Sequence, residues 1–195
     1  MKVVLFNGSP RKGGNIDLLI DRAVATLDVA GQDIVRFNLN AMDIKPCQDC
    51  GGCEKTGRCV IKDDMGLIYD SIREGERFLL ASPIFFFGLS AQAKAMVDRC
   101  QALWCEKYLL KKPVPEGSKG RKGLLLVVGG MKKEIGIQCS EATAKAFFRT
   151  INVNEHETAG FLSIDEKGAV LDHEEVIDAT LKAVARLIDL GRVQG

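Results

Sequence analysis

The chain has 195 residues, of which 46% are hydrophobic, and its 27 Lys and Arg residues nearly balance 26 Asp and Glu residues. This length and apolar content suffice for one core, so we expect a single domain over residues 1–195. The balanced charge provides no basic field for nucleic acid or for an anionic membrane surface. We expect no membrane span and no cleavable leader, because the apolar runs are short and interrupted. The expected location is the cytoplasm.

Short apolar segments alternate with amphipathic ones along the chain. Strands are predicted over 2–6, 33–39, 77–82, 122–128 and 157–164, and helices over 15–30, 63–75, 90–104, 140–151 and 173–191. Because the strands are mostly continuously apolar, we expect a parallel sheet with helices on both faces. This is a doubly wound α/β fold with five strands in the order 2-1-3-4-5. In that order the loops after strands 1 and 3 converge at the carboxyl edge of the sheet.

The first predicted strand is followed by a glycine-rich, cationic turn, "GSPRKGGN". A turn of this kind directs the free amides and the positive dipole end of the next helix towards a ligand. The spacing is neither G-x-G-x-x-G nor a triphosphate P-loop, so it favours a monophosphate. The alternative is an ordinary turn with solvated charges. The expected phosphate contacts are Ser9, Arg11, Lys12, Gly14 and Asn15.

The third predicted strand runs into three consecutive phenylalanines, "SPIFFFG". All three cannot point into one core, so at least one is expected at the mouth of the crevice. An apolar pocket bordered by backbone donors suits a planar ring, and a ring together with a monophosphate indicates FMN. The alternative is a buried strand that leads into a helix. The expected ring contacts are Ser82, Pro83, Ile84, Phe85, Phe86, Phe87 and Gly88, with Gly129 and Gly130 after strand 4 either at the ring edge or in a simple turn.

Four of the seven cysteines form a C-x2-C-x2-C-x5-C motif within a long connection at about 40–62. Iron-sulfur cubes use such close thiolate spacings, whereas structural zinc more often takes two separated knuckles. A [4Fe-4S] cluster is favoured, and zinc or free thiols and disulfides remain open. Because strand 2 lies beside strand 1, we expect a cluster on this loop to lie near the phosphate turn. The expected metal ligands are Cys47, Cys50, Cys53 and Cys59, while Cys100, Cys105 and Cys139 are expected to serve packing.

The turn "GSPRKGGN" followed by "SPIFFFGLSAQAKAMVDR" resembles the flavodoxin-like NADPH-dependent FMN reductase superfamily, and "CQDCGGCEKTGRCVIKDDM" resembles its iron-sulfur flavoprotein branch. The resemblance implies FMN bound by the loops after strands 1 and 3 and a [4Fe-4S] cluster on the four cysteines. It also implies homodimers or homotetramers in which one subunit's cluster serves a neighbour's flavin. Ile16 stands where relatives often have Thr or Ser as a further phosphate ligand, and Phe85 where they often have Tyr. We still expect FMN to bind, with Ile16 among the residues that contact it.

The predicted function is an FMN-dependent electron-transfer oxidoreductase in which the cluster and FMN exchange electrons. A small carrier such as ferredoxin, or NAD(P)H, is the expected donor. No side chain is assigned a catalytic role, because the flavin carries the electrons. The alternative is an NAD(P)H-dependent FMN or quinone reductase with structural or redox-active cysteines. A non-enzymatic redox or metal sensor is a third possibility.

Overall fold

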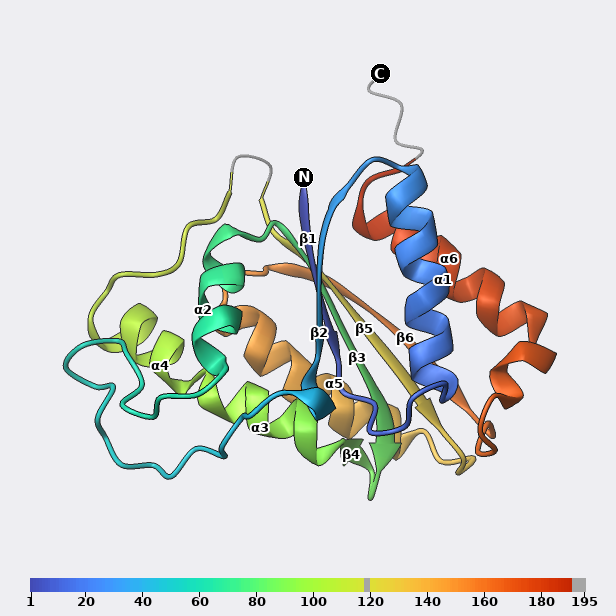
Figure 1. Cartoon of the computed structure of the whole chain (residues 1–195), viewed down its shortest axis with the longest axis horizontal. Coiled ribbons are helices and arrows are strands. Elements are labelled where there is room, and N and C mark those ends of the chain that lie inside the picture. The colour runs from blue at the N-terminus through green and yellow to red at the C-terminus, as the bar shows by residue number, and fades with distance from the viewer. Residues whose placement is uncertain (118–119, 191–195) are drawn as a thin grey trace.

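A computed structural model describes residues 1–117 and 120–190, and its centre is a parallel sheet in the order β2-β1-β3-β5-β6 (Figure 1). Because β5 and β6 are the fourth and fifth predicted strands, the predicted fold and strand order are confirmed. A short β4 (Gly88–Leu89), which the sequence did not reveal, pairs antiparallel with β3. The five parallel strands are β1 (Lys2–Asn7), β2 (Asp33–Asn38), β3 (Arg77–Phe85), β5 (Lys122–Gly129) and β6 (Glu155–Leu162).

Helices cover both faces of the sheet, as a doubly wound fold requires. Figure 1 shows α1 (Asn15–Val29) and α6 (Glu174–Leu187) side by side on one face. The other face carries α2 (Met65–Glu74), α3 (Ala91–Arg99) and α5 (Ile135–Thr150). The short helical segments are η1 (Leu39–Ala41), α4 (Gln101–Trp104), the π-helical turn η2 (Cys105–Leu109) and η3 (Ala169–Asp172).

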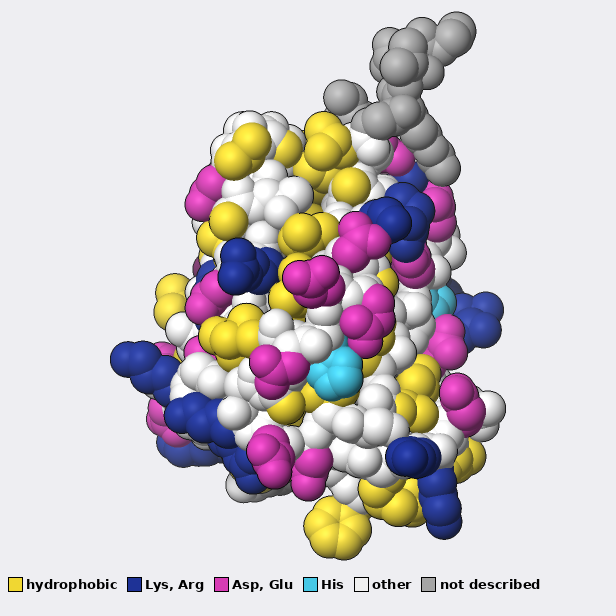
Figure 2. Space-filling model, turned by 90° about the vertical axis from the view of Figure 1, so that its right-hand side faces the viewer, with side chains coloured by type: hydrophobic (Ala, Val, Ile, Leu, Met, Phe, Trp, Pro, Cys, Tyr) yellow, Lys and Arg dark blue, Asp and Glu magenta, His cyan; other side chains and the backbone are white. Residues whose placement is uncertain are grey.

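The core lies on both sides of the sheet, which explains the continuously apolar strands. Successive side chains of a strand point to opposite faces. Val3 and Leu5 of β1 therefore join the cluster under α1 and α6, whereas Val4 and Phe6 join the cluster under α2, α3 and α5. On the outer face of α1 and α6, basic and acidic side chains are interspersed (Figure 2), in keeping with the balanced composition.

Several element boundaries differ from the sequence prediction. The third strand continues to Phe85, and α5 begins at Ile135 rather than at Ser140. Ser140 is buried inside this helix, where its hydroxyl donates to the carbonyl of Gly136 at 2.8 Å, so it is not a cap. The helix predicted over 90–104 is interrupted at Cys100, between α3 and α4. The last strand lies at 155–162 instead of 157–164. The predicted helix end at Gly191 falls outside the described residues.

Within the described ranges, the helices are all too short or too polar to cross a membrane.

Candidate functional site

A cleft lies at the carboxyl edge of the sheet, where the connections after β1, β3, β5 and β6 meet. Its walls come from segments that are far apart in the sequence. The residues predicted from the sequence that line this cleft are Ser9, Arg11, Gly14, Asn15, Ile16, Pro83, Ile84, Phe85, Gly129 and Gly130.

The turn after β1 is held closely against the start of α3. Gly8 donates its amide to the carbonyl of Ala81 at 2.8 Å, and its own carbonyl accepts the hydroxyl of Ser90 at 2.6 Å. A Cβ atom added at Gly8 would lie 2.8 Å from Cβ of Ala93. Only glycine allows this approach, so the residue fixes the height of the turn above the sheet.

Hydrogen bonds within the turn stabilise its shape, and the first residues of α1 line the cleft. The amide of Ser9 donates to Oδ1 of Asn7 at 3.0 Å, and the amide of Arg11 donates to Oγ of Ser9 at 3.2 Å. Gly14 occupies the N-cap position of α1, and no described side chain caps it. Because the first amides of a helix have no partner within the helix, they can donate to an anion in the cleft.

Asp17 balances charge beneath this turn. Its carboxylate accepts the amide of Gly13 at 2.8 Å and the side-chain amide of Asn7 at 2.9 Å, and it also forms an ion pair with Arg36. The negative charge of Asp17, in the first turn of α1, is therefore paired with Arg36 of β2. The cleft side keeps the cationic side chain of Arg11.

Asn15 holds the connection after β6 against the start of α1. Its side-chain amide donates to the carbonyl of Glu166 at 3.0 Å, and its Oδ1 accepts the amide of Val170 at 3.2 Å. The sequence predicts that this side chain contacts the phosphate. In the structure it lines the cleft, but its polar atoms hold a loop.

That connection supplies cleft residues that the sequence analysis missed. Lys167 lies over the phosphate turn, with its Cε 3.7 Å from where a Cβ on Gly13 would stand. Asp165 packs so closely on Gly130 that a Cβ there would be 2.7 Å from its carboxyl carbon. Only the general rule that ligands bind at the carboxyl ends of the strands in this fold could have indicated this loop. The missed residues are Pro10, Val128, Ile164, Asp165 and Lys167.

Five predicted contacts do not line the cleft, which corrects their expected placement. Lys12 borders an adjoining groove, and Ser82 is buried, where its Oγ accepts the amide of Ser90 at 2.9 Å. Phe86 and Phe87 adopt left-handed backbone angles of φ +48° and +65° in the turn between β3 and β4, which directs both side chains to a second groove outside the cleft. Gly88 pairs with Phe85 across that turn.

The two ends of the cleft differ in chemistry. The α1 end offers backbone amides and the cations of Arg11 and Lys167, which suit a phosphate. The hydroxyl of Ser9, predicted as a phosphate contact, donates instead to the carbonyl of Arg11 at 3.2 Å within the turn. The β3 and β5 end offers apolar side chains such as Ile84 and Val128, which suit a planar ring. The residues of the cleft therefore fit FMN.

A second cavity lies between the long loop after β2 and the segment formed by α4 and η2. All four motif cysteines line it, together with Arg99, Gln101 and Cys105 among others. Cys47 and Cys50 are exposed, and Cys53 and Cys59 are half-buried. In the described part of the chain, no group of three or more His, Cys, Asp or Glu side chains is arranged to hold a metal ion. Four thiols on one cavity are nevertheless a donor set that suits a thiolate-bound centre.

The remaining cysteines differ in their burial. Cys100 and Cys105 are buried, as expected for packing, whereas Cys139 is exposed, which corrects its prediction. Cys105 also borders the cavity, with its sulfur 3.6 Å from that of Cys53. Burial, reinforced by the hydrogen bond with Cys105, raises the pKa of the Cys53 thiol to about 12.

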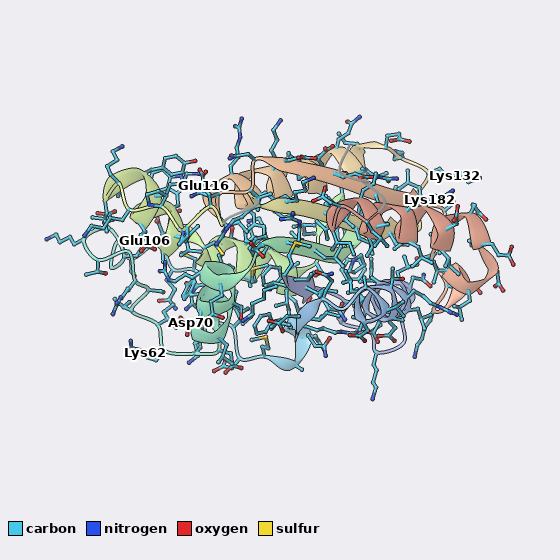
Figure 3. All side chains as sticks on the ribbon, turned by 90° about the horizontal axis from the view of Figure 1, so that it is seen from above. Lys62, Asp70, Glu106, Glu116, Lys132 and Lys182 are labelled. Atoms are coloured by element: carbon cyan, nitrogen blue, oxygen red, sulfur yellow. The ribbon has the colours of Figure 1, made fainter. Side chains whose placement is uncertain are left out.

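The four motif cysteines lie at the far end of α3 from the cleft, so the expectation that a cluster on them lies near the phosphate turn is wrong for a single chain. The start of their loop does reach that turn, where the side-chain amide of Asn40 donates to the carbonyl of Pro10 at 3.5 Å. α3 begins beside Gly8 and has nine residues, which corresponds to about 14 Å. Among the described residues, no residue lines both cavities. Figure 3 shows Lys62 and Glu106 on the opposite side of the molecule from Lys132, which follows β5.

The sheet order, the glycine-rich turn and the cleft at the carboxyl edge define a flavodoxin-like protein with a site for a phosphorylated planar ligand. The profile of the family described as NADPH-dependent FMN reductase matches residues 1–160. The chain belongs to this family, in its iron-sulfur flavoprotein branch. Membership confirms the prediction of a flavin-dependent oxidoreductase that uses FMN.

Individual relatives agree with this assignment. An iron-sulfur flavoprotein of Archaeoglobus fulgidus is 32% identical over 139 residues, which cover 70% of this chain and 67% of the relative. An iron-sulfur flavoprotein of Methanosarcina thermophila is 33% identical over 132 residues, which cover 68% of this chain and 65% of the relative. The chain thus spans about two thirds of the length of these two relatives. The solved NAD(P)H:quinone oxidoreductase of Methanothermobacter marburgensis has the same fold, with a TM-score of 0.69 at 13% identity over 96% of this chain and 97% of that one.

Proposed function

We propose that this chain is an electron-transfer flavoprotein that binds FMN in the cleft and a [4Fe-4S] cluster on Cys47, Cys50, Cys53 and Cys59. The observation that carries the proposal is the pair of cavities at the two ends of α3. One presents amides, cations and an apolar wall, and the other presents four thiols. The names of the iron-sulfur flavoprotein relatives support the cluster.

FMN, when bound, supplies the chemistry by accepting or releasing electrons singly or in pairs. The chain's own residues bind and orient it. The amides at the start of α1 donate hydrogen bonds to the phosphate, and the cations of Arg11 and Lys167 neutralise its charge. Ile84 and Val128 exclude water from one side of the ring site.

The position of the cysteine cavity supports assembly as a homodimer or homotetramer. Within one chain the two cavities are separated by the length of α3, while exposed Cys47 and Cys50 leave the cysteine loop accessible from outside. Exposed apolar side chains on the segments beside the cleft provide a surface that another copy can cover. These are Phe85, Phe86, Phe87, Met131 and Ile135. In such an assembly the loop of one subunit approaches the cleft of its neighbour.

A second candidate function is an NAD(P)H-dependent FMN or quinone reductase, and one observation favours it. The groove that holds Phe86 and Phe87 shares Ile84, Gly129 and Asp165 with the cleft, so a second planar ligand has room beside the ring site. Stopped-flow reduction separates the two functions. Rapid flavin bleaching by NAD(P)H in a Cys59→Ser variant favours the reductase, whereas bleaching that needs reduced ferredoxin and the intact cysteines favours electron transfer. The cytoplasmic location stays a prediction.

Anaerobic isolation followed by assays of FMN, iron and acid-labile sulfide tests the proposed function. We expect all three in the wild-type protein, and we expect Cys59→Ser to lose iron and sulfide while it retains FMN. Cys139→Ser is the matched control, because Cys139 is exposed on α5 and lies outside the cavity. This variant should retain FMN, iron and sulfide. Iron-free wild-type protein, or iron retained in Cys59→Ser, would overturn the cluster assignment.

A further inference from the structure

Arg99 is a buried cation at the edge of the four-cysteine cavity. It is the last residue of α3, it is 1% exposed, and it lines the cavity together with the cysteines. Taking a charge out of water is costly unless it is paired and its donors are satisfied. Its hydrogen-bond partners therefore indicate what the residue does.

The two terminal nitrogens of Arg99 hold both ends of the cysteine loop. Nη1 and Nη2 bind the carboxylate of Asp63 at 2.5 and 3.0 Å, and Nη1 also donates to the carbonyl of Lys45 at 2.7 Å. Asp63 in turn accepts the amides of Lys45 at 3.0 Å and Met65 at 3.2 Å. Lys45 precedes the first motif cysteine and Asp63 follows the last, so this pair closes the base of the loop.

One donor of this buried cation is left over. Within the described part of the chain, Nε of Arg99 is buried and has no hydrogen-bond partner. Burial opposes the charge, but the bond to Asp63 together with the surrounding negative groups raises the pKa of the guanidinium, so Arg99 stays cationic. Among the described residues, Arg77 and Arg121 also have an unpaired Nε, but of these three arginines Arg99 alone lines the cavity of thiols, where its N–H is available to an anionic acceptor.

We propose that Arg99 is the counter-cation of the four-cysteine cavity and that its Nε–H donates to a thiolate or sulfide of the anionic group held there. A centre with four thiolates carries net negative charge, and hydrogen bonds to its sulfur atoms tune its stability and potential. The inference rests on the proposed function, because it concerns the group that those cysteines bind. Asp63 acts as a positioning residue that holds the guanidinium in place.

The chain provides a matched control in Arg121. This arginine is 5% exposed, its Nε also lacks a partner within the described residues, and its Nη atoms donate to the carbonyls of Ile151 and Arg73. It does not line the cysteine cavity. Arg→Lys at either position keeps a positive charge and removes Nε–H. A double variant, Arg99→Met with Asp63→Asn, removes the cation without leaving Asp63 as an unpaired buried charge.

The first test titrates metal-free protein with Co²⁺ and follows the thiolate-to-cobalt absorption, so it does not depend on the native occupant. We expect Arg99→Lys to weaken Co²⁺ binding roughly 10-fold, as for loss of a charged hydrogen bond, and the double variant to weaken it at least as much. Arg121→Lys should bind as the wild type does. FMN affinity and the midpoint of thermal unfolding verify that each variant is folded. Wild-type Co²⁺ affinity in both Arg99 variants, or an equal loss in Arg121→Lys, would overturn the inference.

The second test measures the reduction potential of the cluster by a redox titration followed by EPR. The reduced centre is more negative, so loss of the Arg99 donor should lower its potential, while Arg121→Lys leaves the potential unchanged. The two hypotheses fail in different ways. If iron never binds but Arg99→Lys weakens Co²⁺ binding, the cluster proposal fails and the role of Arg99 stands. If the cluster forms and its potential is unchanged in Arg99→Lys and in the double variant, the role of Arg99 fails.

Discussion

The sulfur atoms of Cys53 and Cys105 lie 3.6 Å apart, which places a fifth thiol against the four-cysteine cavity. Cys105 is fully buried at the start of the π-helical turn η2, whereas Cys53 belongs to the loop. A π-helical turn shifts the side chains that follow it relative to the preceding helix, and such turns are frequent at functional sites.

In metal-free protein, mild oxidation with an azo compound such as diamide should join Cys53 to Cys105. The two thiols lose two protons and two electrons to the azo group, which is reduced to a hydrazine, and a sulfur–sulfur bond forms. Peptide mapping by mass spectrometry without reductant identifies the pair. Cys139→Ser should leave the pattern unchanged, because that thiol is exposed elsewhere. A Cys50–Cys53 disulfide with Cys105 still reduced would contradict this expectation.

Gly8→Ala should weaken FMN binding roughly 10-fold and lower the free energy of unfolding by about 1–3 kcal/mol, as overpacking does. The new Cβ would stand 2.8 Å from Cβ of Ala93 and 3.1 Å from the carbonyl of Ala81, so the phosphate turn must move. Gly66→Ala is the control, because nothing lies within 4 Å of its Cβ position in α2. That variant should gain about 0.5–1 kcal/mol from helix propensity and keep its FMN affinity. Equal FMN affinity in both variants would argue against a tightly seated turn.

Lys167→Ala should reduce FMN affinity about 2- to 5-fold at low ionic strength, with a smaller effect in high salt. The side chain is exposed but lies over the phosphate turn, so its contribution is a screened attraction for the phosphate. Lys182 on α6 forms an ion pair with Asp178 at 2.7 Å and does not line the cleft, so Lys182→Ala is the control. Fluorescence titration at two salt concentrations measures the effect. A salt-independent loss would contradict an electrostatic role.

Stability should fall at alkaline pH partly through Cys100. Burial raises the pKa of this thiol from 9.0 to about 12, so between these values the unfolded chain releases a proton that the folded chain keeps. The contribution is complete below pH 9 and is lost as the pH rises towards 12, with a slope of up to about 1.4 kcal/mol per pH unit. The free energy of unfolding, measured with urea, should therefore decline less steeply between pH 9 and 10.5 in Cys100→Ala than in the wild type. Cys139→Ala, in which an exposed thiol is removed, should decline as the wild type does. Parallel declines in all three proteins would contradict the assignment.

The fold and most of the cleft could be predicted because their signals are local. Continuously apolar strands indicated a sheet covered on both faces, and the turn around Gly8 and Gly14 indicated an anion site at the start of a helix. The start of α5 was misplaced because Ser140 is a favourable capping residue, yet here it bonds back to Gly136 inside the helix.

What the sequence could not provide depends on contacts between distant residues. Lys167 and Asp165 carry no motif, and the bonds of Asn15 to Glu166 and Val170 bring their loop to the cleft. The cluster on the four cysteines was expected near the phosphate turn because β2 neighbours β1. The Arg99–Asp63 pair, which joins residues 36 positions apart, fixes their loop instead at the other end of α3.

Equilibrium binding of riboflavin 5′-phosphate and of riboflavin to the flavin-free protein tests the central claim most directly. If the start of α1 binds a phosphate while the ends of β3 and β5 enclose the ring, FMN should bind at least roughly 10-fold more tightly than riboflavin, since charge-assisted hydrogen bonds are lost with the phosphate. Added inorganic phosphate should compete with FMN and leave riboflavin binding unaffected. Equal affinity for the two flavins would contradict the assignment of this cleft.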